Sequence, residues 1–170
     1  METALAIVIV STGVLSIIYA QQAFLQENDW SSRLSTATYL ANEVREMTIR
    51  LPRHDPVTWT AYWGPEPNEL NLEDFDDLDD FDGADGLGLT YAALDATGPV
   101  NARREVIPNM QGWSQYIRVF NVDPMDIAAP GDPLMDGQTT MMRVEVVVSY
   151  QGPLDAEPGE ITRVSWISRY

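Results

Sequence analysis

The chain opens with a long run of residues that carry no side-chain charge. No charged residue occurs between Thr3 and Gln26, and segments 4–10 and 14–20 are almost wholly apolar. About 20 residues of this kind cross the hydrocarbon core of a bilayer as a helix. The interruption at residues 11–13 is mild, because hydroxyls can bond back to the helix and small residues let another helix approach closely. We therefore predict the transmembrane half of a helix over residues 1–26.

A cleavable secretory signal and the buried helix of a soluble protein are the alternatives for this run. A secretory signal needs a basic start, a shorter apolar region and a small-x-small cleavage site, whereas the first basic residue here is Arg33. The length of the uncharged run disfavours a buried helix. Acidic Glu27 and Asp29 follow the run without a basic flank. By the positive-inside rule, the long C-terminal part is expected outside the cytoplasm.

The helical pattern continues beyond the apolar run. Apolar residues recur there at steps of three and four, which places them on one stripe of a helix. They are Trp30, Leu34, Ala37, Ala41, Val44, Met47 and Leu51. Pro52 ends the pattern, because proline lacks a backbone donor and disfavours a helical residue before it. The pattern predicts an amphipathic half over residues 27–52, continuous with the first half and needing a folded domain to cover its stripe.

The C-terminal third alternates between apolar and polar positions, as strands do. Segments 113–122, 141–150 and 161–170 are rich in aromatic and β-branched residues, and the loop 151–159 is expected to join the last two as an antiparallel pair. Residues 113–170 therefore predict an antiparallel sheet of three or four strands with one apolar face. The helical stripe is its expected cover. With residues 53–112 as a loop-rich region, the fold class is α+β.

Charge narrows the range of partners. The chain of 170 residues has 26 acidic residues against ten basic ones, all arginine, for a formal net charge of −16. Nucleic acid and anionic lipid headgroups are poor partners for such a chain. It has no cysteine, which excludes disulfides, thiolate metal clusters and a cysteine nucleophile.

The loop-rich region contains an acidic segment at residues 71–86, NLEDFDDLDDFDGADG. Closely spaced aspartates repel one another unless they are solvated or bridged by a cation, and calcium accepts six to eight such oxygen ligands. The candidate metal ligands are Asp76, Asp77, Asp79, Asp80 and Asp82. The segment does not match an EF-hand, because alignment on Gly83 places Leu78 and Leu89 at the first and last ligand positions. A solvated or turn-forming loop is the alternative.

Little in the sequence indicates an enzyme. His54 is the only histidine, and a general base oriented by Asp55 is conceivable, but no nucleophile motif accompanies it. Neither a phosphate-binding glycine loop nor an H-E-x-x-H site is present. The aromatic loop with Trp59, Tyr62 and Trp63 could offer a sugar platform, although packing over the domain is the commoner use of such side chains.

The N-terminal segment resembles a known family. A glutamate followed by Thr-Ala-Leu-Ala-Ile-Val-Ile-Val, then Gly13-Val-Leu, then Ala41-Asn-Glu-Val-Arg-Glu-Met, is similar to type IV pilins and type II secretion pseudopilins, and most to the minor ones. The string Asp76-Asp-Leu-Asp-Asp-Phe-Asp-Gly83 also resembles a stretch in minor pilins of the mannose-sensitive haemagglutinin type.

The resemblance implies a structural subunit, with Glu2 as the residue that assists docking. In that family a peptidase removes a short basic leader, the new N-terminus is methylated, and the helix packs into a filament. The implied partners are other pilin or pseudopilin subunits, the inner membrane, and the prepilin peptidase if an upstream leader exists. The alternative is an extracytoplasmic module that is anchored by its helix, never polymerises, and uses the acidic loop for calcium or another ligand.

Overall fold

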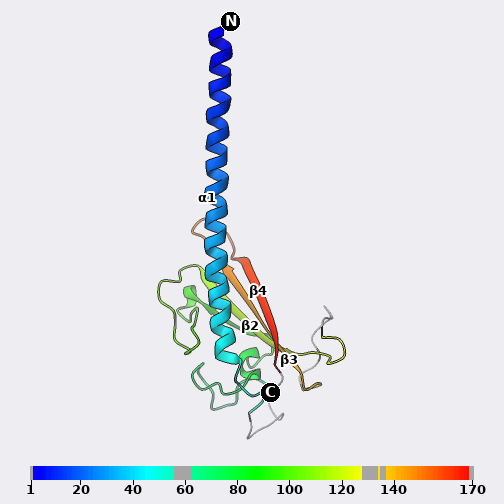
Figure 1. Ribbon diagram of the computed structural model, residues 1–170. Coiled ribbons are helices and arrows are strands. Elements are labelled where there is room, and N and C mark those ends of the chain that lie inside the picture. The colour runs from blue at the N-terminus through cyan, green and yellow to red at the C-terminus, as the bar shows by residue number, and fades with distance from the viewer. Residues whose placement is uncertain (1, 56–62, 128–133, 135–136, 169–170) are drawn as a thin grey trace. The chain divides into compact units, whose positions relative to one another are not determined.

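The computed structural model describes residues 2–55, 63–127, 134 and 137–168 (Figure 1). The chain divides into two compact units, residues 1–36 and 37–170. Helix α1 (Glu2–Thr48) contributes to both, and a four-stranded antiparallel sheet belongs to the second. These elements confirm the predicted α+β class.

The first unit consists of the apolar part of α1. Its hydroxyl groups bond back to the helix: Thr12 Oγ1 lies 3.0 Å from the carbonyl oxygens of Val8 and Ile9, and Ser16 Oγ donates to the Thr12 carbonyl at 2.8 Å. Ser and Thr can satisfy their polar groups in this way inside a helix. The polar interruption at residues 11–13 therefore leaves the helix unbroken.

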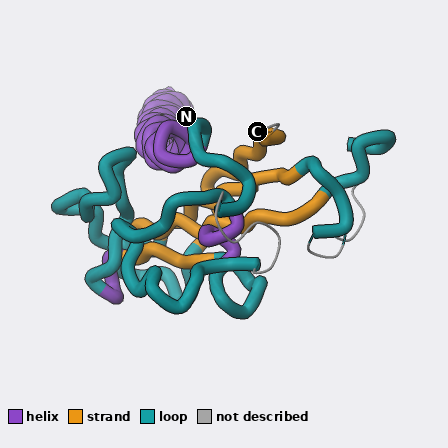
Figure 2. The backbone as a smooth tube through the Cα atoms, turned by 90° about the horizontal axis from the view of Figure 1, so that it is seen from below, coloured by secondary structure: helices purple, strands orange, loops and turns teal. Residues whose placement is uncertain are grey.

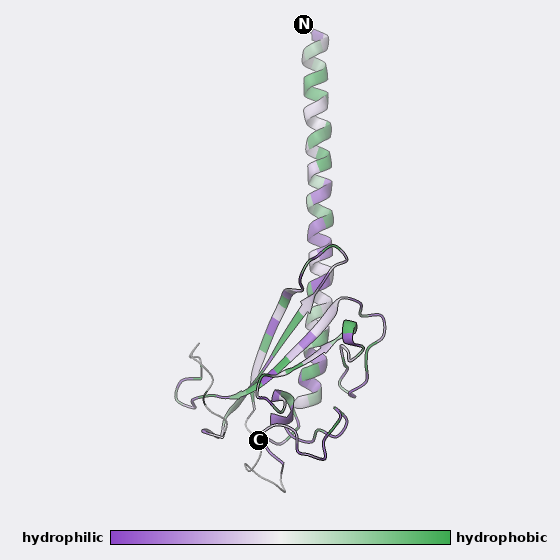
Figure 3. Ribbon diagram, turned by 180° about the vertical axis from the view of Figure 1, so that it is seen from behind, coloured by the Kyte–Doolittle hydropathy of each residue, from purple (hydrophilic) through white to green (hydrophobic). Residues whose placement is uncertain are grey.

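The sheet of the second unit is a meander in which each strand pairs with the next along the chain. The strands are β1 (Leu89–Ala92), β2 (Trp113–Asn121), β3 (Met142–Tyr150) and β4 (Gly159–Ser168), in the order β1-β2-β3-β4. Seen from below, they form one layer (Figure 2). Apolar and polar residues alternate along the strands (Figure 3), because successive side chains point to opposite faces. The expected antiparallel pairing of β3 with β4 is confirmed.

The end of α1 packs against the apolar face of the sheet. Helix residues Leu40 and Val44 are fully buried in one cluster with Ile117 of β2 and Val146 of β3. Gln115 of β2 fixes this contact, because its Nε2 donates to the Leu40 carbonyl at 2.9 Å. The predicted role of the stripe as a cover for the sheet is thus confirmed for the turns after residue 36.

Several details differ from the sequence expectations. Helix α1 ends at Thr48 rather than at Pro52, and its stripe is buried only from Ala37 onward, with Trp30 and Leu34 exposed. Strand β1 lies inside the region expected to be loop-rich. The expectations for Trp59 and Tyr62, and for the last two residues of the chain, lie outside the described residues.

Candidate functional site

The first candidate site is the apolar surface of α1 in the first unit. By length and composition this helix could cross a membrane, and none of its most apolar stretch is buried within the chain. The side chains of Ile7, Val8, Ile9 and Val10 are each 59–65% exposed. Successive helical residues are about 100° apart, so these four cover all sides of the helix. The surface is therefore apolar all round and needs lipid or other helices.

Two residues on this surface have no evident role within the chain itself. Glu2 is exposed in the first turn of α1 and forms no ion pair with any described residue. A Cβ atom added at Gly13 would meet nothing within 4 Å. Glycine costs a helix interior about 0.8–1.0 kcal/mol relative to alanine. The internal packing of the unit does not explain this cost.

The second candidate site is the acidic segment, whose residues 77–82 are buried in the domain, whereas Glu73, Asp74, Asp76 and Asp85 are exposed. Phe75, Leu78 and Phe81 recur at three-residue steps and are buried, with the two phenyl rings in edge contact at 5.4 Å between centroids. These apolar side chains anchor the segment on the core and bring Asp77, Asp79 and Asp80 in with them. Short helix η2 (Asp79–Asp82) lies here, and all of its residues are buried.

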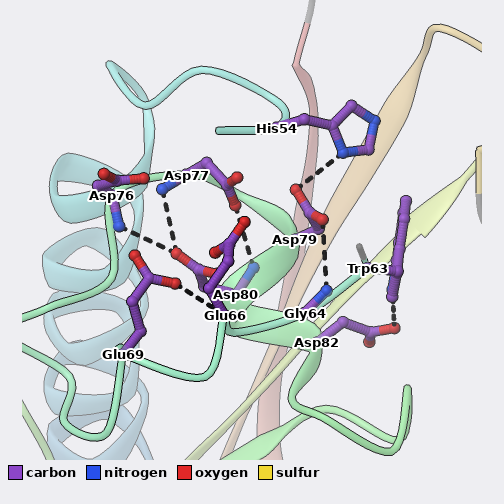
Figure 4. A network of polar contacts seen from close by, with 10 residues as sticks. All are labelled: His54, Trp63, Gly64, Glu66, Glu69, Asp76, Asp77, Asp79, Asp80 and Asp82. Atoms are coloured by element: carbon purple, nitrogen blue, oxygen red, sulfur yellow. Dashed lines mark hydrogen bonds and ion pairs between the residues drawn. The ribbon is translucent and has the colours of Figure 1, made fainter. Parts of the chain in front are cut away.

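Asp80 is at the centre of the buried carboxylates (Figure 4). Its Oδ2 accepts backbone N–H groups of Asp76 and Asp77 at 2.9 and 3.1 Å, and its own N–H donates to Asp77 Oδ1 at 3.3 Å. The neighbouring turn brings two glutamates to the same place, with the Glu66 N–H donating to Glu69 Oε2 at 3.0 Å. The carboxylates form two groups that share Asp80, and in each group three oxygens lie within 4.8 Å of one another. The groups are Glu66, Glu69 and Asp80, and Asp76, Asp77 and Asp80.

Asp79 and Asp82 make contacts with residues outside the two groups. Asp79 Oδ2 accepts the Gly64 N–H at 3.3 Å, and its Oδ1 lies 3.0 Å from His54 Nδ1. This second contact does not have the geometry of a hydrogen bond. Asp82 accepts Trp63 Nε1–H at 3.0 Å and the Val119 N–H of β2 at 3.2 Å. These contacts tie the loop after α1 and strand β2 to the acidic segment.

Burial makes ionisation of the cluster costly. Loss of solvation, assisted by a hydrogen bond with the side chain of Asp79, raises the pKa of Asp77 to about 9. Loss of solvation, assisted by the Glu66 side chain, raises the pKa of Glu69 to about 8. Burial likewise raises the pKa of Asp80 to about 6, although the two backbone N–H groups oppose the change. The cluster thus favours a bound proton or a bound cation.

The structure therefore brings together only part of the predicted ligand set. Asp76, Asp77 and Asp80 converge, whereas Asp79 and Asp82 serve contacts between loops. The sequence-based prediction did not include Glu66 and Glu69. Their spacing of three residues around Pro67 is a turn signal, and the Glu69 N–H donates to the Glu66 carbonyl at 2.9 Å. That signal could have indicated that both glutamates point the same way.

Comparison of the chain with protein-family models, curated proteins and solved structures found no match.

Proposed function

We propose that this chain is a minor pilin-like or pseudopilin structural subunit, which assembles through α1 into a type IV pilus or a secretion pseudopilus. Before assembly it would be a single-pass protein of the inner membrane, with residues 37–170 outside the cytoplasm. The observation that carries the proposal is the double use of one helix. The first part of α1 exposes apolar side chains on all sides, and its last turns belong to the core of a folded domain.

The exposed part of α1 requires an apolar environment. Full burial of a valine or isoleucine side chain is worth about 1.5–3 kcal/mol. The many such side chains before residue 26 therefore drive this segment out of water. Lipid satisfies the requirement before assembly, and neighbouring helices of the same kind would satisfy it in a filament.

Gly13 and Glu2 favour helical neighbours over lipid alone. A glycine with open space above its Cα lets a second helix approach closely, which is how small residues act in membrane helix pairs. A carboxylate near the end of an apolar helix is costly unless a cation meets it. In a staggered bundle of similar helices, the N-terminal amine of a neighbour can be that cation, and the pair then sets the register.

Replacement of Glu2 tests the proposal. With the native upstream coding region retained, Glu2→Ala should leave insertion into the membrane unchanged and reduce incorporation into filaments at least tenfold, because the docking charge is lost. The measurement is quantitative mass spectrometry of sheared surface filaments against the membrane fraction. Glu27→Ala is the matched control, since Glu27 is an exposed acid on the same helix and should incorporate normally.

A second candidate function rests on the buried carboxylates. A membrane-anchored binding module that never polymerises would use its helix for lipid only and the acidic cluster for a ligand. In that case Glu2→Ala would have no effect, and the wild-type chain would be absent from filaments. Either result would overturn the subunit proposal.

A further inference from the structure

We propose that Glu66, Glu69, Asp76, Asp77 and Asp80 form a binding site for one divalent hard cation, calcium in particular. This site differs from the one expected from the sequence, because it gains two glutamates and loses Asp79 and Asp82. It lies entirely within the second unit. The inference does not depend on whether the chain assembles into a filament.

The first observation is the convergence of oxygens. Asp80 belongs to both groups of carboxylates, and within each group the candidate ligand atoms lie within 4.8 Å of one another. Calcium binds oxygens at about 2.3–2.6 Å, so two ligands on opposite sides of one ion are on the order of 5 Å apart. The three carboxylates of each group are thus close enough to share an ion, and Asp80 links the two groups.

The second observation is an unpartnered oxygen at the centre of the cluster. Asp80 is 0% exposed, and while its Oδ2 accepts two backbone N–H groups, its Oδ1 is buried with no hydrogen-bond partner among the described residues. Figure 4 shows the carboxylate of Asp80 between Asp77 on one side and Glu69 on the other. A buried carboxylate oxygen without a partner is costly. A cation bound between the two groups would satisfy it.

The third observation is that the buried carboxylates of Asp77, Asp80 and Glu69 lack a compensating positive charge among the described residues. The sequence has no basic residue other than His54 between Arg53 and Arg103, and the imidazole of His54 faces Asp79. Burial raises the pKa of Asp76, and Arg104 only opposes that rise at the exposed edge of the cluster. Among the described residues, Asp77, Asp80 and Glu69 form no ion pair with a basic side chain.

The backbone already orients the carboxylates. One oxygen of each of three ligands is held by a backbone N–H group: Asp77 Oδ1, Asp80 Oδ2 and Glu69 Oε2. The ligand geometry is therefore largely prepared before the ion arrives.

The ligand types favour calcium over other metals. All five are carboxylates, and neither histidine nor cysteine belongs to either group. Hard oxygen donors select calcium, magnesium or manganese rather than zinc or copper. Magnesium demands a near-ideal octahedron and retains several waters, whereas calcium accepts many carboxylate oxygens in irregular geometry. Five carboxylates from two loop segments fit calcium better.

Calorimetry and thermal unfolding of the full chain in detergent micelles test this site. After removal of metal with EDTA and dialysis, titration with calcium chloride should give heat for one ion per chain. Calcium should also raise the Tm by several degrees, because an ion that binds only the folded state stabilises it. Magnesium chloride should give a smaller shift at the same concentration. An absence of both heat and Tm change at millimolar calcium would overturn the proposal.

Substitution of Asp80 separates ion binding from a purely structural role. Asp80→Asn keeps an oxygen for the two backbone N–H groups but removes the charge. It should unfold in EDTA at a Tm no lower than that of the wild type, yet bind calcium at least tenfold more weakly. Glu69→Gln is a second variant with the same expected loss, in case Asp80→Asn does not fold.

Glu73→Gln is the matched control. Glu73 lies in the same acidic segment, is exposed, and is outside both groups of carboxylates. This variant should retain the calcium affinity and the Tm shift of the wild type. Wild-type affinity in Asp80→Asn and Glu69→Gln, or an equal loss in Glu73→Gln, would mean that calcium responds only to overall charge, and the proposed site would be wrong.

Discussion

Asp77 and Asp80 show how single residues in this chain take on properties that their residue type does not suggest. An aspartate is normally ionised and solvated, but these two are at most 1% exposed and are held by backbone N–H groups. Their position follows from the apolar residues between them, because burial of Phe75, Leu78 and Phe81 carries the intervening carboxylates into the domain. The cost of this burial is the origin of the raised pKa values.

The raised pKa values predict that the metal-free protein loses stability as pH rises. Below about pH 4, Asp77, Asp80 and Glu69 are protonated in both the folded and unfolded states, so their full contribution is present. The folded-state pKa values are about 6 for Asp80, about 8 for Glu69 and about 9 for Asp77. As the pH rises through these values, the buried groups must ionise and their contribution to the stability of the fold is lost. Thermal unfolding in EDTA should therefore give a Tm that falls between neutral and alkaline pH.

Asp77→Asn is the test variant for that pH dependence. The amide keeps an acceptor for the Asp80 N–H but cannot ionise, so the fall in Tm at alkaline pH should become smaller. Glu73→Gln should follow the wild type. A wild-type Tm that is flat or rising over this range would contradict the assigned pKa directions.

Helix and sheet are the parts of the molecule that the sequence predicted best. Alternation at Met142, Val144, Val146 and Val148 identified the buried face of β3, because a strand repeats every two residues. Strand β1 was not predicted, since four residues are too few to show a period. The candidate metal site was predicted only in part. The approach of Glu66 and Glu69 to Asp80 depends on tertiary packing of two loops, which spacing along the chain does not reveal.

Gln115 offers a test of how the helix is fixed to the sheet. Its buried amide donates to the carbonyls of Leu40 and Val100 and accepts the Val100 N–H at 2.8 Å. Gln115→Met keeps the approximate volume but leaves buried backbone groups unpaired, at a cost of about 1–3 kcal/mol each. Chemical denaturation in micelles should show a loss in this range, whereas Gln111→Met, at an exposed position, should change little. An unchanged stability of Gln115→Met would contradict this role.

Gly13 separates helix stability from assembly. Gly13→Ala should stabilise α1 by about 0.8–1.0 kcal/mol, and Gly13→Leu should also stabilise it, because both residues favour a helix more than glycine does. If Gly13 lies where another helix approaches, assembly should nevertheless fall, and more for leucine than for alanine because of its size. The measurement is the amount of each variant in purified filaments relative to the membrane fraction. Normal assembly of Gly13→Leu would show that no helix approaches closely there.

At the scale of the whole molecule, one helix serves two environments. The apolar side chains of the first unit are exposed among the described residues, and the second unit is a domain with its own core and a buried carboxylate cluster. A filament subunit needs both properties, because its helix must exchange lipid for other helices while its domain remains folded. A plain membrane anchor needs only the contact between its apolar helix and lipid.

Cross-linking from the apolar segment tests this account most directly. The chain has no cysteine, so Ile9→Cys labelled with a photoreactive benzophenone places one probe on the exposed helix surface. In cells that assemble filaments, irradiation followed by mass spectrometry should identify the apolar N-terminal helix of another subunit as the cross-linked partner, and the product should be present in sheared filaments. Cross-links to lipid alone, with the chain confined to the membrane fraction, would contradict the account.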